Sequence, residues 1–557
     1  MNFKRWTGGT LGLLALGSFA WACSSKSDDC SANKDCGAYN GGASGVGTGG
    51  AGGSGGASGR GGSSGTSGGS GKAGASGDAG SSGDAGAAGA ASTCDGTLSP
   101  DVDGCVISDD YGVFVSPAGS DSDGEGTIEK PYATLTKALT SVDAINRIYV
   151  CAADYSEPKT LQIPSGVSIY GGFTCADGKW AYDATSKASF QPSDPIGVDI
   201  ESADSVTLQD VLIKADDATS PSASSFGMMV VNSTNVLLKG VTIQAGKGAA
   251  GSSGAPGASG SDGTASTATQ NGSPASCSNA PASQPGGVSI PKICGSQGGN
   301  GGTGFAATGY SPLQDGAGGF LVEPTNGGKG SNTSGQNGGV GQPGANGSSG
   351  ERGVAAKDIG GFQATGYSAA NGGAGTVGQP GQGGGGGGSS LGKANCVGAS
   401  GGAGGMGGCG GDPGAGGSGG GASIALFSWN SDIVIDGGAL TALAGGGGGS
   451  GGKGHTGGNG VAGGQGGGPE TPNAIGKGGT GGDGGIGGNG GNAAGGTGGP
   501  SISLAYKGKE PNKKNTPAFN HAGTGGALGT GGQLGDDSMK WGPNGSVGQA
   551  ADEYLVP

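Results

Sequence analysis

The stretch GVDIESADSVTLQDVLIKA, residues 197–215, decides the fold. It aligns without gaps on residues 227–245, GMMVVNSTNVLLKGVTIQA, and apolar residues alternate with polar ones in both copies. A third copy occupies residues 425–442, and SISL at residues 501–504 echoes SIAL at residues 423–426. Alternation with a period of two is typical of strands with one buried face. A repeat of about 20 to 30 residues made of short strands and polar turns predicts a parallel β-helix.

The repeats also identify the side chains that should point into this β-helix. Each coil of such a fold buries its inward residues against the next coil. In the first two copies the alternating apolar residues are Val198, Ile200, Val206, Leu208, Val211 and Ile213, matched by Met228, Val230, Val236, Leu238, Val241 and Ile243. In the third copy we expect Phe427, Ile433, Ile435 and Leu440 on the same register.

The segment before these repeats resembles the opening of right-handed pectin-lyase-like β-helices. The resemblance is carried by VFVSPAGSD at residues 113–121 and KPYATLTKAL at residues 130–139. It implies a first strand followed by a short helix over the end of the barrel, with Pro131 at the helix start and Leu135, Ala138 and Leu139 capping the core. Residues 148–151 and 166–173 would form the first coils. We therefore expect an all-β protein built on a right-handed parallel β-helix.

Glycine supplies the second pattern, because it accounts for 146 of the 557 residues. Every third residue from Gly47 to Gly89 is glycine, and the period returns over residues 445–466 and 478–490, mostly as Gly-Gly-x. Three residues per turn is the repeat of the polyproline II helix. The absence of proline from residues 47–89 excludes collagen there and favours a flexible Gly/Ser/Ala tether.

The later tracts allow two interpretations, a polyglycine II bundle or disorder. Further runs lie at residues 248–263, 338–353 and 401–419. The Gly-Gly-x tracts resemble the polyglycine II bundles of glycine-rich antifreeze proteins and phage tail adhesins, and the glycine-rich repeats of mycobacterial surface proteins. Two tracts begin after equivalent points of the repeats, Ala245 and Ala444, so we expect excursions from one turn of the coil. FAATGYS at 305–311 recurs as FQATGYS at 362–368, which indicates repetition within this region.

The predicted organisation follows these changes in composition along the chain. We expect a signal peptide (1–22), a lipid anchor and tether (23–92), an N-terminal cap with β-helix coils (93–245), a glycine-rich insertion (246–421), a coil (422–444), a second insertion (445–499), and a final coil with a C-terminal tail (500–557).

The N-terminus resembles a bacterial lipoprotein signal. Lys4 and Arg5 precede an apolar run that ends at Ala20-Trp21-Ala22-Cys23, where the thiol of Cys23 would be acylated. Trp21 and Ala20 depart from the lipobox pattern, and Ala20-Trp21-Ala22 also fits a signal peptidase site of the A-x-A type. We expect lipid anchoring at the outer membrane or cell surface, and secretion if Cys23 is not acylated. The serine after Cys23 resembles the outer-membrane sorting pattern.

Cysteine counts support the anchored form, since removing Cys23 from eleven cysteines leaves ten, an even number suited to disulfides. Nearest-neighbour pairing would give Cys30–Cys36, Cys94–Cys105, Cys151–Cys175, Cys277–Cys294 and Cys396–Cys409. The 24-residue spacing of Cys151 and Cys175 is about one coil, so that bridge would join successive coils. No C-x-x-C spacing occurs, and the histidines His455 and His521 lie far from any cysteine, so we expect no metal and no cofactor.

Catalysis receives little support from the residues. Polygalacturonases resemble one another through an aspartate pair with G-H-G and R-x-K segments. Asp216-Asp217 could supply the pair, but we expect no histidine in the β-helix, and Arg147 is followed by Ile148-Tyr149, which does not fit R-x-K. Lyase chemistry would need clustered acids and a base, for which Asp199, Glu201 and Asp210 are the candidate acids. Trp180 and Trp429 would stack on sugars if exposed, although a structural role is favoured for both.

The formal net charge of -14 and the scarcity of arginine exclude nucleic acid as a partner. We therefore expect a non-catalytic cell-surface lipoprotein that presents an adhesive or structural surface. Its partners would be the membrane, through the lipid, and an extracellular polysaccharide or another cell-surface component. The alternatives are a carbohydrate-active β-helix enzyme, a polysaccharide lyase or glycosidase, and an ice-binding face.

Overall fold

A computed structural model describes residues 94–557, except 143–145, 265–266, 308–310, 322–325, 522 and 536–539. The fold below is that of the unit Ala90–Pro557. The predicted signal peptide and the whole predicted anchor and tether, with Cys23, Cys30 and Cys36, lie outside the described residues.

The strand-rich part is a parallel β-helix with three sheets, as the repeats predict. The first sheet runs in the order β1 (Val113–Val115), β2 (Arg147–Cys151), β5 (Ser168–Thr174), β9 (Thr207–Gln209), β12 (Val236–Lys239), β19 (Ile433–Asp436) and β22 (Asn512–Asn515). The second contains β3 (Asp154–Glu157), β7 (Ala188–Pro192), β10 (Val211–Lys214), β13 (Thr242–Gln244), β20 (Ala439–Ala442) and β23 (Ala518–His521). The third contains β4 (Leu161–Gln162), β8 (Ile196–Glu201), β11 (Ser225–Val231), β18 (Ser423–Trp429), β21 (Ser501–Lys507) and β24 (Ala550–Leu555).

The remaining elements are short. The strand β6 (Ala181–Tyr182) pairs antiparallel with β5, and two antiparallel pairs lie in the first insertion, β14 (Ser283–Gln284) with β15 (Gly304–Phe305), and β16 (Gly361–Gln363) with β17 (Gly366–Ser368). The helical elements are η1 (Gly104–Val106), α1 (Leu135–Leu139), η2 (Ala176–Gly178), α2 (Thr267–Gln270) and η3 (Pro312–Gln314).

Three columns of stacked side chains fill the core of the β-helix. The columns, one from each sheet, are Ile148, Ile169, Leu208, Leu238 and Ile435; Tyr155, Phe190, Ile213, Ile243 and Leu440; and Leu161, Val198, Met228, Leu426 and Leu504. The gapless alignment of the first two copies is confirmed, since Val198 pairs with Met228 and Ile213 with Ile243. The expectation for Phe427 is wrong: Leu426 takes the inward position, and Phe427 points outward into a second apolar cluster.

The helix α1 closes the N-terminal end of this core. Leu135 and Ala138 are buried in the core cluster, and Leu139 packs against it, as expected. The helix begins later than expected, however, because its N-cap is Thr134 and not a residue next to Pro131. The buried carboxylate of Glu157 fixes this start by accepting hydrogen bonds from the backbone N–H groups of Leu135 (2.8 Å) and Thr136 (3.1 Å).

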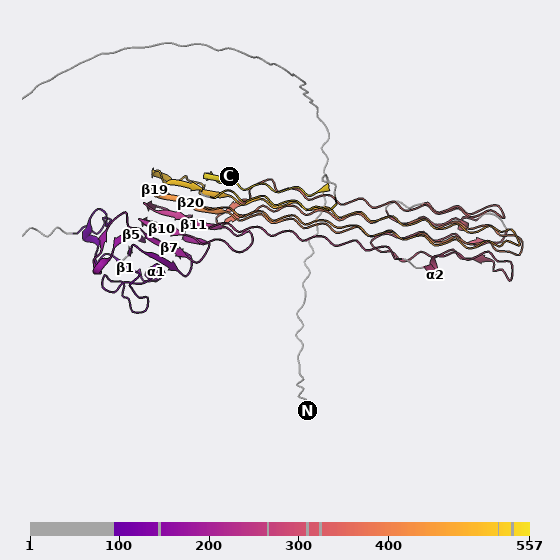
Figure 1. Ribbon diagram of the computed structural model, residues 1–557, viewed down its shortest axis with the longest axis horizontal. Helices are drawn as coiled ribbons and strands as arrows, with labels where there is room; N and C mark the ends of the chain where they lie inside the picture. The colour runs from indigo at the N-terminus through magenta and orange to yellow at the C-terminus, as the bar shows by residue number, and fades with distance from the viewer. Residues whose placement is uncertain are drawn as a thin grey trace, which may run out of the picture. The chain divides into compact units, whose positions relative to one another are not determined.

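The glycine-rich segments leave the β-helix at one corner, between a strand of the second sheet and a strand of the third. The three connections are β13 to β18, β20 to β21, and β23 to β24. Figure 1 shows them as extended segments running beside one another away from the strands. The third connection, residues 522–549, was not expected, and it divides what we expected to be a final coil and tail. β18 completes the coil that begins with β12 and β13, whereas β19 and β20 begin the next coil. Residues 422–444, which we expected to form one coil, therefore belong to two coils.

The glycine segments pair through backbone hydrogen bonds that point in three directions. Gly384, Gly385 and Gly386 donate in turn to Gly405 (2.8 Å), Gln342 (2.9 Å) and Ala317 (2.9 Å), which lie on three different segments. A three-residue turn directs successive N–H groups about 120° apart, as in polyglycine II. The described tracts therefore form an ordered bundle, and the disordered interpretation is wrong for them.

The number of glycines per triplet follows the number of neighbouring segments. Residues 383–388 are all glycine and lie buried, whereas residues 248–263 form an edge with one half-buried glycine per triplet and mostly exposed residues between. A Cβ on Gly386 would overlap the carbonyl oxygen of Asn300. Side chains are thus admitted where a segment has no neighbour.

Side-chain carbonyl oxygens serve backbone donors where the backbone lacks a neighbouring segment. Among the described residues of the bundle, eleven Asn and Asp side chains accept a backbone N–H of an adjacent segment or turn, at distances from 2.6 to 3.2 Å. They are Asp262, Asn271, Asn300, Asp315, Asn337, Asn346, Asn371, Asp483, Asn489, Asn492 and Asn544. Each supplies a hydrogen bond that a further glycine segment would otherwise have made.

Candidate functional site

The outer face of the third sheet is apolar and is covered by a hairpin from the first insertion. Phe226, Ile424, Phe427 and Ile502 are buried there, although they point away from the β-helix core. The hairpin β16–β17, which is the second FxATGYS copy, covers them with Phe362 and Tyr367. The repeated motif therefore has a packing role at this position.

The hairpin is held by aromatic contacts. The ring of Phe362 lies 5.2 Å from that of Tyr367 and 5.5 Å from that of Tyr554 on β24. The Tyr367 hydroxyl donates to the carbonyl oxygen of Ile359, and burial raises the pKa of this hydroxyl. In the first copy of the motif, β15 pairs with β14, while residues 308–310 lie outside the described ones.

Two of the three candidate acids lie beside each other at the edge of this outer face. Asp199 and Glu201 both lie on β8, two residues apart and therefore on one side of the strand. Burial raises the pKa of Asp199, and the charge of Glu201 acts in the same direction, against a hydrogen bond from Gln162 (3.2 Å). Glu201, Gln162 and Lys159 line a hollow of about 320 Å³ next to α1.

The third candidate acid is elsewhere. Asp210 lies in the turn between β9 and β10 with φ of 52°, is 7% exposed, and accepts a hydrogen bond from the Tyr182 hydroxyl. Burial, followed by this hydrogen bond, raises the pKa of Tyr182. Asp199 and Glu201 lie on the third sheet, whereas Asp210 lies in a turn between the first sheet and the second, so the predicted set forms no single cluster.

A neighbouring ion pair joins the N-terminal segment to the first sheet. Lys239 Nζ lies 2.6 Å from Asp101 Oδ2. Burial acts to raise the pKa of Asp101, but its hydrogen bonds, that from Lys239 above all, outweigh this effect and lower the pKa to about 2. The pair ties residues before β1 to β12, and neither residue was singled out from the sequence, because nothing in their spacing relates them.

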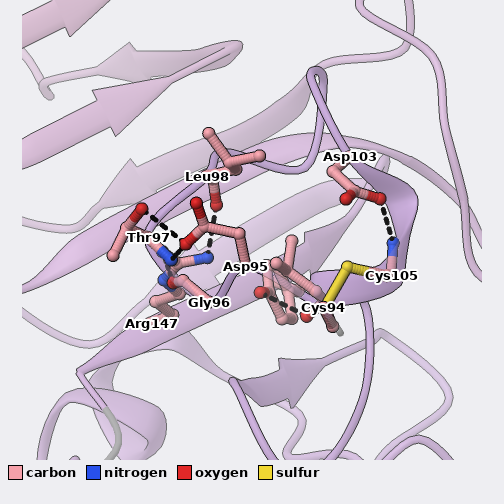
Figure 2. The surroundings of a disulfide bond; sticks show 10 residues. Cys94, Asp95, Gly96, Thr97, Leu98, Asp103, Cys105 and Arg147 are labelled. Carbon is pink, nitrogen blue, oxygen red and sulfur yellow. Dashed lines mark hydrogen bonds between the residues drawn. A yellow bond between two sulfur atoms is a disulfide. The ribbon is translucent and has the colours of Figure 1, made fainter. Parts of the chain in front are cut away.

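Arg147 also holds this N-terminal segment. Its guanidinium donates to the carbonyl oxygens of Leu98 (2.7 Å) and Gly96, beside the disulfide Cys94–Cys105, as Figure 2 shows. Both groups that accept from Arg147 are backbone carbonyls, so its side chain is engaged in structure.

The acid pair Asp216-Asp217 lies in a loop after β10. Asp216 accepts from the Gln191 amide at 3.1 Å, and Asp217 accepts from the backbone N–H of Lys247 at 2.7 Å. Each aspartate therefore contacts a different neighbouring coil, as loop residues do.

Both candidate tryptophans pack in aromatic clusters. Trp180 meets the rings of Phe114 at 4.8 Å and Phe173 at 5.9 Å, outside the first sheet. Trp429 ends β18, is half-buried, and lies 6.0 Å from Phe427. These ring contacts of Trp180 and Trp429 agree with the structural role that we favoured for both residues.

The two histidines lie in different parts of the unit. His455 is in the glycine bundle, where its Nδ1 is 2.8 Å from Ser259 Oγ and accepts the N–H of Thr456 at 3.0 Å. His521 ends β23 and pairs with Asp552 at 2.8 Å, so the expectation that the β-helix lacks histidine is wrong. Among the described residues, no group of three or more His, Cys, Asp and Glu side chains is arranged to hold a metal ion.

Four disulfides lie within the described residues. Cys94–Cys105 and Cys151–Cys175 are as predicted, and the latter joins β2 to the end of β5. The other two predicted pairs are wrong, because the bonds are Cys277–Cys396 and Cys294–Cys409. Each of these two disulfides joins neighbouring segments of the bundle. The bonded cysteines are 119 residues apart in the sequence in Cys277–Cys396 and 115 apart in Cys294–Cys409.

Figure 1 and the strand order place this chain among parallel β-helix proteins. Residues 118–250 match the family model described as "Protein of unknown function (DUF1565)". One solved structure with a similar chain is a protein titled "Rhamnogalacturonan lyase", at 17% identity and a TM-score of 0.20. The likeness covers 24% of this chain and 36% of that protein.

No curated protein matches the chain. Within the described residues, we find no helix with the length and apolar character that crossing a membrane requires.

Proposed function

We propose that this chain is a non-catalytic cell-surface lipoprotein that presents a stiff glycine-rich bundle on a β-helical base. The observation that carries the proposal is the bundle itself, in which successive glycine N–H groups bond to three different segments. Such a bundle holds its outward side chains at fixed spacing without needing an apolar core.

The surface residues of the bundle suit contact with a hydrated polymer. Along residues 477–489 the non-glycine position of each triplet is exposed or half-buried and carries, in order, Lys477, Thr480, Asp483, Ile486 and Asn489. Small polar groups that repeat every three residues recur about every 9 Å along a polyproline II helix. An extracellular polysaccharide, or another cell-surface component, is the class of partner that such a repeating surface would engage.

Anchoring would come from acylation of Cys23. Two or three acyl chains on one residue give stable membrane attachment. The described disulfides agree with folding in an oxidising compartment.

Intact-mass spectrometry of the protein purified from its own membranes tests the anchor. We expect a diacylglyceryl-type addition on Cys23 and ten thiols that become reactive after reduction. A Cys23→Ser chain should then appear in the medium while wild type stays with the cells. An unmodified chain starting at Cys23 would contradict the anchor, and the protein would be secreted.

A binding assay tests the presenting surface separately. Sedimentation of the Cys23→Ser chain with insoluble polysaccharides should retain the folded protein, and unfolding the bundle should abolish retention. Failure to bind any polysaccharide or cell surface tested, with an intact bundle, would contradict this part.

One observation favours a second function, a polysaccharide lyase. Glu201 and Lys159 line the same hollow, and Asp199 lies beside Glu201 with a raised pKa, so an acid pair and a basic side chain meet at one place. Lyase activity would appear as unsaturated products from acidic polysaccharides. It should disappear in Lys159→Ala and persist in Lys214→Ala, since Lys214 lies on β10 of another sheet.

A further inference from the structure

The last coil of the β-helix breaks the pattern of its core. Strands β22, β23 and β24 end the three sheets, so no strand lies beyond any of them among the described residues. Their inward positions continue the three core columns: Lys513 pairs with Ile435, Phe519 with Leu440, and Glu553 with Leu504. Two of the three core columns therefore end in a charged residue.

The two charges meet each other across the end of the coil. Lys513 Nζ lies 2.7 Å from Glu553 Oε2 and 2.8 Å from Glu510 Oε1. The side chain of Lys513 is 18% exposed and that of Glu553 is 35% exposed. The pair lies over the core residues Ile435 and Leu504, where water still reaches it from one side.

An uncapped end would be adhesive for a second copy of this chain. Three adjacent edge strands offer unpaired backbone groups, and an aliphatic end layer would add apolar surface to be buried. Two copies joined at this end would meet through the same surface on each, as in a twofold dimer. Stacking would remove the remaining water from Lys513 and Glu553, and desolvation of an ion pair opposes such burial.

We infer that the ion pair Lys513–Glu553 is an end cap that prevents two copies from joining end to end through their last coils. Inward-pointing charges on edge strands are a known means of blocking strand pairing between molecules. The N-terminal end needs no such device, because α1 covers it.

The test replaces the charges with aliphatic residues in the full chain. All samples carry Cys23→Ser, so that acylation does not affect the measured mass. We expect Lys513→Leu/Glu553→Leu to have twice the monomer mass by light scattering at micromolar concentration, while the parent chain remains a monomer.

Two controls separate the end cap from a general loss of charge. Glu125→Leu/Lys130→Leu removes an ion pair of equal length, 2.7 Å, that is more exposed and lies far from the last coil in the sequence. The exchange Lys513→Glu/Glu553→Lys keeps a pair at the end. Both should stay monomeric.

The inference is overturned if the double leucine chain is folded by circular dichroism and remains a monomer, or if the exchanged pair dimerises equally. Should the double leucine chain not fold, Lys513→Met/Glu553→Met is measured in its place with the same two criteria. A parent chain already dimeric through β22 to β24 would overturn the inference as well.

Discussion

Two adjacent glycines of the bundle differ sharply in the space available for a side chain. Gly446 is buried, and a Cβ on it would overlap the carbonyl oxygen of Ala249. Gly447 is half-buried, and the nearest atom to its Cβ would be the carbonyl oxygen of Ala527, at 3.7 Å. We therefore expect Gly446→Ala to destabilise the bundle and Gly447→Ala to be tolerated.

The hydrogen bonds around Gly446 set the size of the effect. Its N–H donates to Gly421 at 2.8 Å, and its carbonyl accepts from Gly499 at 2.8 Å. Moving segments apart to admit a methyl group weakens such bonds, at about 1 kcal/mol each, and overpacking adds about 1–3 kcal/mol. We expect a loss of about 3 kcal/mol for Gly446→Ala. Gly447→Ala should be neutral or more stable by about 0.4–1 kcal/mol, because alanine restricts the unfolded chain.

Guanidinium unfolding followed by circular dichroism measures both variants. The unfolded chains differ by the position of one methyl group between neighbouring residues, so the difference between the variants reports on the folded bundle. Equal free energies of unfolding for Gly446→Ala and Gly447→Ala would refute three-directional packing at this position.

Three other predictions concern single contacts. Asp101→Asn should lower the free energy of unfolding by about 1 kcal/mol at neutral pH, a value reduced for solvent screening of the partly exposed pair with Lys239. Because the pKa of Asp101 is lowered to about 2, this contribution to stability is fully present above about pH 4 and disappears as the pH falls through about 2. Unfolding of both chains measured across a pH series tests this, and a difference that does not shrink at low pH would contradict it. Cys294→Ser/Cys409→Ser removes a disulfide between residues 115 apart in the sequence; because Cys277–Cys396 stays in place, the loop that opens has only about 30 residues, and the loss should be about 3.5–4 kcal/mol on the chain-entropy model. A non-reduced peptide map that instead links Cys294 to Cys277 would disprove the pairing. Phe362→Ala should cost about 2 kcal/mol and make the β16–β17 hairpin sensitive to protease, whereas unchanged resistance would mean that the hairpin does not depend on this ring.

The core of the β-helix was predictable because its coils repeat. Alternation identifies inward residues, and gapless copies such as 197–215 and 227–245 lie directly beside each other. Phe427 was misplaced because outward positions of the third sheet are also apolar, and alternation cannot separate two buried faces. The sequence of the covering hairpin β16–β17 does not indicate which surface the hairpin packs against.

The bundle was predictable in its local form and not in its connections. A glycine at every third position indicates polyproline II geometry, but it does not say which segments are neighbours. The disulfides Cys277–Cys396 and Cys294–Cys409 depend on those neighbours, so sequence proximity predicted them wrongly. The excursion between β23 and β24 was missed although its glycines keep the same period, at every third position from Gly523 to Gly535 and again from Gly542 to Gly548.

Hydrogen exchange of the glycine amides tests the central claim most directly. The account predicts that peptides covering residues 381–388 exchange as slowly as those from β11, because the N–H groups of Gly384 to Gly388 are bonded to neighbouring segments. Exchange of residues 381–388 at the rate of an unstructured chain, while β11 stays protected, would contradict the hydrogen-bonded bundle and with it the presenting surface proposed here.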